Sequence, residues 1–99
     1  MSLTAIYRIR AKEGKEEELL QILQRGREFA LNVEGCERFE VLQHKDDPRD
    51  FVMTETWSTP EAHGTHFDQN VKGSGVLEQA EQLMEEPFPA PAEAYYLFR

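Results

Sequence analysis

The sequence has a single cysteine, no long apolar run and few basic residues. With only Cys36, neither an internal disulfide nor a cysteine zinc cluster can form. No stretch approaches the roughly 20 apolar residues of a membrane-spanning helix. The first ten residues, MSLTAIYRIR, also lack the apolar segment of a secretory signal. We therefore expect a cytoplasmic protein.

Basic residues are outnumbered by acidic ones. Eleven Lys and Arg against nineteen Asp and Glu give a formal net charge of −8. Nucleic acids and anionic membranes require a basic footprint, so we expect neither as a partner. A small anionic ligand held by a local arginine remains compatible with this charge.

The 99 residues are enough for one domain, and we expect a single domain over 1–99. Alternating apolar and polar residues predict strands, and apolar spacings of three and four predict helices. The predicted strands span 3–11, 36–44, 51–57 and 94–98, and the helices span 16–32, a stretch from Pro60, and a stretch capped by Ser74. Three prolines make 86–92 an extended connector before the last strand, which lies within 93–99.

The first helix carries an apolar stripe that should face the sheet. A glycine on the stripe, Gly26, is expected to let helix and sheet approach closely. The stripe consists of Leu19, Ile22, Leu23, Gly26, Phe29, Ala30 and Val33.

The order of elements is β-α-β-β-α-β, which predicts an α+β, ferredoxin-like fold with helices on one face of a four-stranded antiparallel sheet. The strands carry large apolar residues on both faces, such as Tyr7 against Ile6 and Phe39 against Leu42. The face away from the helices therefore needs a cover. We predict a homodimer packed sheet against sheet.

The stretch 51–67 combines a strand, a capped turn and the start of a helix. Ser58 or Thr59 can cap the helix, and Pro60 suits its first turn. At such a corner Trp57 and His66 could face one cavity.

Three segments carry a resemblance to a known family. They are GKEEE at 14–18, EGCERFEVLQ at 34–43 and ETWSTPEAHGTHF at 55–67, and the most specific residues are Glu55, Trp57 and His66. The chain resembles the antibiotic biosynthesis monooxygenase (ABM) domain family. The resemblance implies a dimeric α/β barrel built from ferredoxin-like halves.

The resemblance implies several different activities. Some members oxidise quinols or polyketide anthrones with O₂ and no cofactor, others degrade haem, and others isomerise a phosphorylated metabolite. By alignment, the positions that serve haem degradation carry Tyr7, His66 and Val76 here, and all three depart from that pattern. Haem degradation is therefore not expected.

His66 is the leading catalytic candidate. A histidine with an ordinary pKa near 6.5 can act as the base that removes a phenolic or enolic proton. The alternative is a helix histidine that only caps or packs. Its neighbour His63 could form a metal-binding pair with it, but no third ligand is evident, and we expect no metal site.

Three aromatic residues are candidates for binding substrate. Trp57 could stack on a planar substrate or could simply fill the core. Tyr7 could hydrogen-bond a substrate oxygen or a backbone group, and Phe67 could contribute to the cavity rim.

Glu55 is a carboxylate on the same strand face as Met53 and Trp57. Burial without a partner would make it an acid or base. We favour pairing with an arginine, such as Arg8, Arg38 or one from a partner chain.

Three functions are consistent with the sequence. The first is a cofactor-independent monooxygenase that oxidises a small quinol-like or polyphenolic compound with O₂, and it requires an apolar cavity. The second is an isomerase of a small polar metabolite, with or without a phosphate group, and it requires converging arginines. The third is a non-catalytic dimer that binds small molecules in a stress response, and it predicts a filled cavity. The aromatic residues near Trp57 favour the first.

Overall fold

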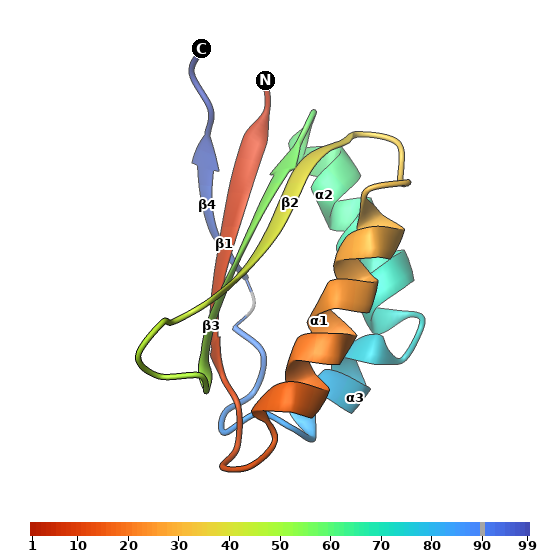
Figure 1. Ribbon diagram of the computed structural model, residues 1–99. Helices are drawn as coiled ribbons and strands as arrows, with labels where there is room; N and C mark the ends of the chain where they lie inside the picture. Colours follow the sequence, from red (N-terminus) through yellow and green to blue (C-terminus); the bar gives the residue numbers. More distant parts are fainter. Residues whose placement is uncertain (90) are drawn as a thin grey trace.

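A computed structural model describes residues 1–89 and 91–99. Four antiparallel strands form one sheet in the order β2-β3-β1-β4, and the helices all cover the same face (Figure 1). The elements are β1 (Leu3–Arg10), α1 (Glu16–Ala30), β2 (Cys36–Gln43), β3 (Asp50–Trp57), α2 (Pro60–His66), the π-helix η1 (Phe67–Lys72), α3 (Val76–Glu81) and β4 (Glu93–Tyr96). The predicted α+β, ferredoxin-like fold is confirmed.

The two central strands position the residues of interest. In the antiparallel register of β1 and β3, Tyr7 lies opposite Met53 and Ala5 lies opposite Glu55. All four side chains are buried on the face that the helices cover. The predicted alternation of these strands therefore holds, and it brings Tyr7 and Glu55 to one side of the sheet.

Helix α1 buries a narrower stripe than predicted. Leu19, Leu23 and Ala30 are buried, but Phe29 is 58% exposed. Phe29 precedes Ala30 by one position, which turns its side chain about 100° away from the centre of the buried stripe. Assigning Phe29 to the core was wrong.

We had expected Gly26 to let the helix pack closely on the sheet, and this expectation was wrong. A methyl group built on its α-carbon would meet no heavy atom within 4 Å. The helix is therefore not drawn tightly onto the sheet at this point.

The second helical region begins as predicted and then changes form. Thr59, not Ser58, caps α2: its hydroxyl accepts a hydrogen bond of 3.1 Å from the backbone nitrogen of Ala62, and Pro60 follows at the first position. After His66 the backbone continues as η1. Here the backbone nitrogen of Gly73 donates to the oxygen of Asp68, five residues earlier, as in a π-helix.

The region after η1 contains less regular structure than predicted. Helix α3 ends at Glu81, and Met84, which lies beyond it, pairs with Ala11 in a single β-bridge. Of the predicted connector 86–92, Ala90 lies outside the described residues. Strand β4 stops at Tyr96 because only its four residues pair with β1.

The side of the sheet away from the helices carries exposed apolar groups. Leu42 is 49% exposed and Tyr95 is 57% exposed.

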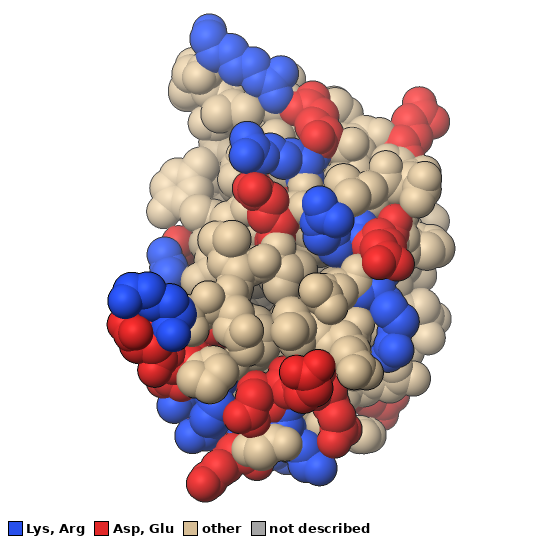
Figure 2. All heavy atoms as spheres, in the orientation of Figure 1, with Lys and Arg blue, Asp and Glu red and all other residues tan. Residues whose placement is uncertain are grey.

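On the face seen in Figure 2, acidic and basic side chains are interspersed around an uncharged centre. Within residues 1–89 and 91–99, no helix has the length and apolar character needed to cross a membrane.

Candidate functional site

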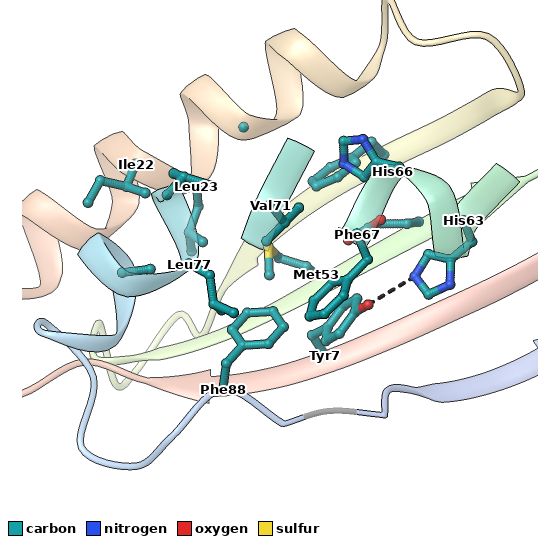
Figure 3. A pocket seen from close by; sticks show the side chains of 15 residues that line it. Tyr7, Ile22, Leu23, Met53, His63, His66, Phe67, Val71, Leu77 and Phe88 are labelled. Carbon is teal, nitrogen blue, oxygen red and sulfur yellow. Dashed lines mark hydrogen bonds between the residues drawn. The ribbon is translucent and has the colours of Figure 1, made fainter. Parts of the chain in front are cut away.

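A cavity of about 70 Å³ lies between the sheet and the helices (Figure 3). Most of its lining is apolar, and four lining residues carry polar groups of interest: Tyr7, Glu55, His63 and His66. The remaining lining residues are Ile22, Leu23, Gly26, Phe39, Met53, Phe67, Val71, Val76, Leu77, Ala80 and Phe88. A mostly apolar cavity with a few convergent polar groups is the usual form of a small-molecule site.

The polar groups come from three elements. Tyr7 lies on β1 and Glu55 on β3, while His63 and His66 lie three residues apart on α2. The cap at Thr59 fixes where α2 begins, so it also sets how both histidines face the sheet. Residues that are far apart in the sequence thus meet at one end of the cavity.

Tyr7 and His63 form a hydrogen-bonded pair. Tyr7 Oη lies 2.9 Å from His63 Nε2, and Figure 3 shows the two groups pointing toward each other. Burial, with a contribution from the charge of Glu55, raises the pKa of Tyr7 above its usual value of 10.0. Burial lowers the pKa of His63. Both groups are therefore neutral near pH 7.

His66 is only 5% exposed and packs on Trp57 with ring centroids 4.7 Å apart. Burial, with a contribution from His63, lowers the pKa of His66 to about 4. The side-chain nitrogen of Asn70 lies 3.0 Å from His66 Nδ1. An amide nitrogen can only donate, so Nδ1 accepts and the ring proton resides on Nε2.

This environment changes the chemistry available to His66. A general base works best with a pKa near the working pH, and a value of about 4 makes the imidazole a weak base. A neutral imidazole with its proton on Nε2 can instead donate a hydrogen bond.

Glu55 has the properties that we had expected of His66. Burial raises the pKa of Glu55 to about 7, although a hydrogen bond from Trp57 opposes the shift. Trp57 Nε1 donates this bond to Glu55 Oε1 over 3.1 Å. A carboxyl group with a pKa near 7 can both take up and release a proton at neutral pH.

Neither Arg8 nor Arg38 pairs with Glu55, so the pairing predicted within this chain is wrong. Arg38 pairs with Glu40, and Arg8 is exposed because it alternates with Tyr7 and so points to the opposite face of the sheet. The partner of Glu55 is the indole nitrogen of Trp57, which carries no positive charge. Because no cation offsets the burial, the pKa of Glu55 stays raised.

The aromatic candidates occupy different places. Tyr7 and Phe67 line the cavity, whereas Trp57 is fully buried behind His66 and is absent from the lining. Of the two alternatives for Trp57, its position fits the residue that fills the core. Phe67 and Phe88 line the cavity, and the ring of Phe88 lies 4.9 Å from that of Tyr7.

Sequence reasoning overlooked two residues of this site. His63 was considered only for metal binding, although its spacing from His66 already placed both on neighbouring helical positions. Phe88 lies in a proline-rich connector, and no pattern there indicated a contact with the core.

The lining holds no lysine or arginine among the described residues. Val76 lines the cavity and offers no metal-binding atom. Across residues 1–89 and 91–99, no group of three or more His, Cys, Asp or Glu could hold a metal ion.

Comparisons with known proteins identify the family. Residues 2–70 match the profile of the antibiotic biosynthesis monooxygenase family, ABM. This chain belongs to the ABM family. The match spans Tyr7, Glu55, His63 and His66, so all four polar groups of the cavity lie inside the ABM domain.

Solved structures share the ABM fold. One from Nitrosomonas europaea, provisionally named an antibiotic biosynthesis monooxygenase, is 23% identical with a TM-score of 0.84, and the alignment covers 95% of this chain and 88% of that one. A second structure with the same provisional name, from Deinococcus radiodurans, is 19% identical with a TM-score of 0.84. Its alignment covers 100% of this chain and 94% of that one. A third, from Bacteroides thetaiotaomicron, is described as a possible oxidoreductase and is 17% identical, with a TM-score of 0.81 and 95% of each chain covered. The comparison with curated proteins found no match.

Proposed function

We propose that this ABM-family protein is a cofactor-independent monooxygenase that oxidises a small phenolic or quinol-like compound with O₂. The observation that carries the proposal is the apolar cavity in which Tyr7, Glu55, His63 and His66 converge. Such a cavity suits a planar apolar substrate with an acidic hydroxyl.

The substrate supplies all the electrons in this reaction. Loss of the phenolic proton gives a phenolate, which transfers one electron to O₂ and leaves a phenoxyl radical. Superoxide and the radical then combine into a ring peroxide anion, which takes up the proton released in the first step and becomes a hydroperoxide. Elimination of water gives the quinone, so one oxygen atom enters the product and the other leaves as water. For phenol itself the balance is C₆H₆O and O₂ to C₆H₄O₂ and H₂O.

Two residues have distinct roles in the proposal. Glu55 accepts the phenolic proton, because its pKa of about 7 leaves much of it ionised at neutral pH. His66 keeps its proton on Nε2 and stabilises the phenolate by hydrogen bonding. The Tyr7–His63 pair provides a second polar contact that orients the hydroxyl.

The two other functions have less support. A phosphorylated substrate would need cationic groups, and the described lining has none. The non-catalytic function predicts a filled cavity, whereas the cavity next to His66 contains free space.

We also propose that the exposed face of the sheet is covered by a second copy of this chain. Leu42 and Tyr95 lie on that layer, and the extended C-terminal residues beyond β4 expose Phe98 at 80%. A second copy offers the same apolar surface, as an isologous interface requires.

Oxygen consumption tests the proposed function. We expect the purified protein to consume O₂ with substituted phenols or quinols in the presence of a metal chelator. Glu55→Gln should lower kcat by about 10²-fold or more. His66→Ala should also lower it, while His44→Ala, which changes an exposed histidine, should not. If no compound of this class is consumed, the proposal is wrong.

A further inference from the structure

The cavity separates polar from apolar groups along its length. His63 and His66 lie toward one end, where Tyr7 points its hydroxyl at His63, whereas Ile22, Leu23 and Leu77 lie toward the other (Figure 3). The polar end is formed by β1, β3 and α2, and the apolar end by α1 and α3. A bound molecule must therefore have its hydrogen-bonding groups on one edge.

The volume limits the size of that molecule. The cavity has a free volume of about 70 Å³. A single water needs about 10–15 Å³ on this measure, so the space corresponds to roughly five to seven waters, or about 150–200 Å³ of liquid. One aromatic ring with a small substituent fits this space, and fused rings exceed it.

Gly26 keeps the apolar end open. It lines the cavity, and a methyl group built on it would contact nothing within 4 Å. In the middle of α1, glycine is unfavourable compared with alanine. The unfilled space next to Gly26 therefore has no role in packing the helix against the sheet.

We infer that the cavity binds a single-ring phenol or ortho-diol, with its hydroxyl edge at Glu55, Tyr7 and His63 and a small apolar substituent beside Gly26. This inference rests on the proposed function of the same site and specifies its substrate class. Two adjacent hydroxyls can both reach polar partners. A para-diol would place its second hydroxyl among aliphatic side chains, where it loses its hydrogen bonds to water without replacement.

Anaerobic calorimetric titration tests the inference, because binding is then measured without oxidation. The probes are 4-methylcatechol, hydroquinone and 2,3-dihydroxynaphthalene. We expect 4-methylcatechol to bind at least ten-fold more tightly than either of the others. Equal affinities for all three, or no binding of 4-methylcatechol, would overturn the inference.

Substitutions at Gly26 test the position of the substituent. Gly26→Ala should weaken 4-methylcatechol binding several-fold more than it weakens catechol binding, and Gly26→Leu should abolish both. Gly64→Ala is the matched control, since Gly64 is also helical with open space around it but does not line the cavity. Should Gly26→Leu fail to fold, Gly26→Ala still decides, because alanine favours the helix. Identical effects of Gly26→Ala on the two catechols would place the substituent elsewhere.

The outcomes separate this inference from the proposed function. Selective binding of 4-methylcatechol without O₂ consumption would refute the monooxygenase and leave the ligand class standing. Consumption of O₂ with fused-ring and single-ring compounds at equal kcat/KM would support the monooxygenase and refute the size limit.

Discussion

Glu55 and His66 give the fold opposite dependences on pH over nearly the same interval. The pKa of Glu55 rises from 4.5 to about 7, so its contribution to stability is complete below pH 4.5 and is lost as the pH rises to about 7. The pKa of His66 falls from 6.5 to about 4, so its contribution is complete above pH 6.5 and is lost as the pH falls. In the unmodified protein these two effects offset each other.

Single substitutions should separate the two effects. In Glu55→Gln, the free energy of unfolding should decrease by about 2 kcal/mol from pH 6.5 to pH 4.5, because the lowered pKa values of His66 and His63 then act without the opposing effect of Glu55. In His66→Gln, it should decrease by about 2–3 kcal/mol from pH 4.5 to pH 7. Urea denaturation followed by circular dichroism measures both, with His44→Gln as the exposed control. Two variants with the same pH profile as the unmodified protein would contradict this prediction.

The Tyr7–His63 hydrogen bond should be measurable as a coupling energy. Tyr7→Phe keeps the buried ring and leaves His63 Nε2 without its partner. We expect a loss of about 1–2 kcal/mol in unfolding free energy, and a coupling of about 1 kcal/mol in a double-mutant cycle with His63→Ala. Tyr96→Phe, at an exposed tyrosine on the opposite face of β4 from Tyr95, is the control. Additive single effects would mean that the two groups do not interact.

At the scale of elements, the cap of α2 controls how the histidines are presented. Thr59→Ala removes the acceptor for the backbone nitrogen of Ala62 and should cost about 1 kcal/mol of stability. Ser58→Ala, one residue earlier, should cost less because Thr59 still caps the helix. Equal losses in thermal denaturation would show that the cap is shared between the two hydroxyls.

A second element-scale prediction concerns the loop between α1 and β2. Gly35 has φ +93°, and a methyl group there would lie 2.9 Å from the β-carbon of Ala62 on α2. Gly14 has a similar φ of +79° with open space around it. Gly14→Ala should therefore cost about 1–2 kcal/mol for the left-handed backbone alone. Gly35→Ala should lower the free energy of unfolding clearly more than Gly14→Ala does. Equal losses would show that α2 moves aside freely.

The contrast between predicted and observed elements follows from the range of the interactions involved. The strands with Tyr7 and Glu55 were predictable because alternation is local and one face is buried. The change to a π-helix after His66 was not, because it depends on which carbonyl Gly73 reaches. The raised pKa of Glu55 likewise depends on Trp57 and on burial by helices distant in sequence, so residue identity alone suggested the wrong partner.

For the whole molecule, the main prediction is the oligomeric state. A chain of 11.5 kDa should elute with a mass of about 23 kDa, twice that of one copy, in size-exclusion chromatography with light scattering. Leu42→Glu puts a charge on the exposed sheet face and should shift the mass toward one copy. Phe29→Glu changes an apolar residue of similar exposure on the helical layer and should leave the mass unchanged. A single-copy mass for the unmodified protein at micromolar concentration would refute the dimer.

The packing of Trp57 on His66 has an optical consequence. Trp57 is the only tryptophan of the chain and is fully buried, with its indole against one catalytic candidate and its nitrogen bonded to another. Its fluorescence emission should therefore lie at short wavelength and come from a single environment. Protonated imidazole quenches indole emission, so the intensity should fall as the pH approaches the low pKa of His66. The protein thus contains its own reporter of the protonation state of the cavity.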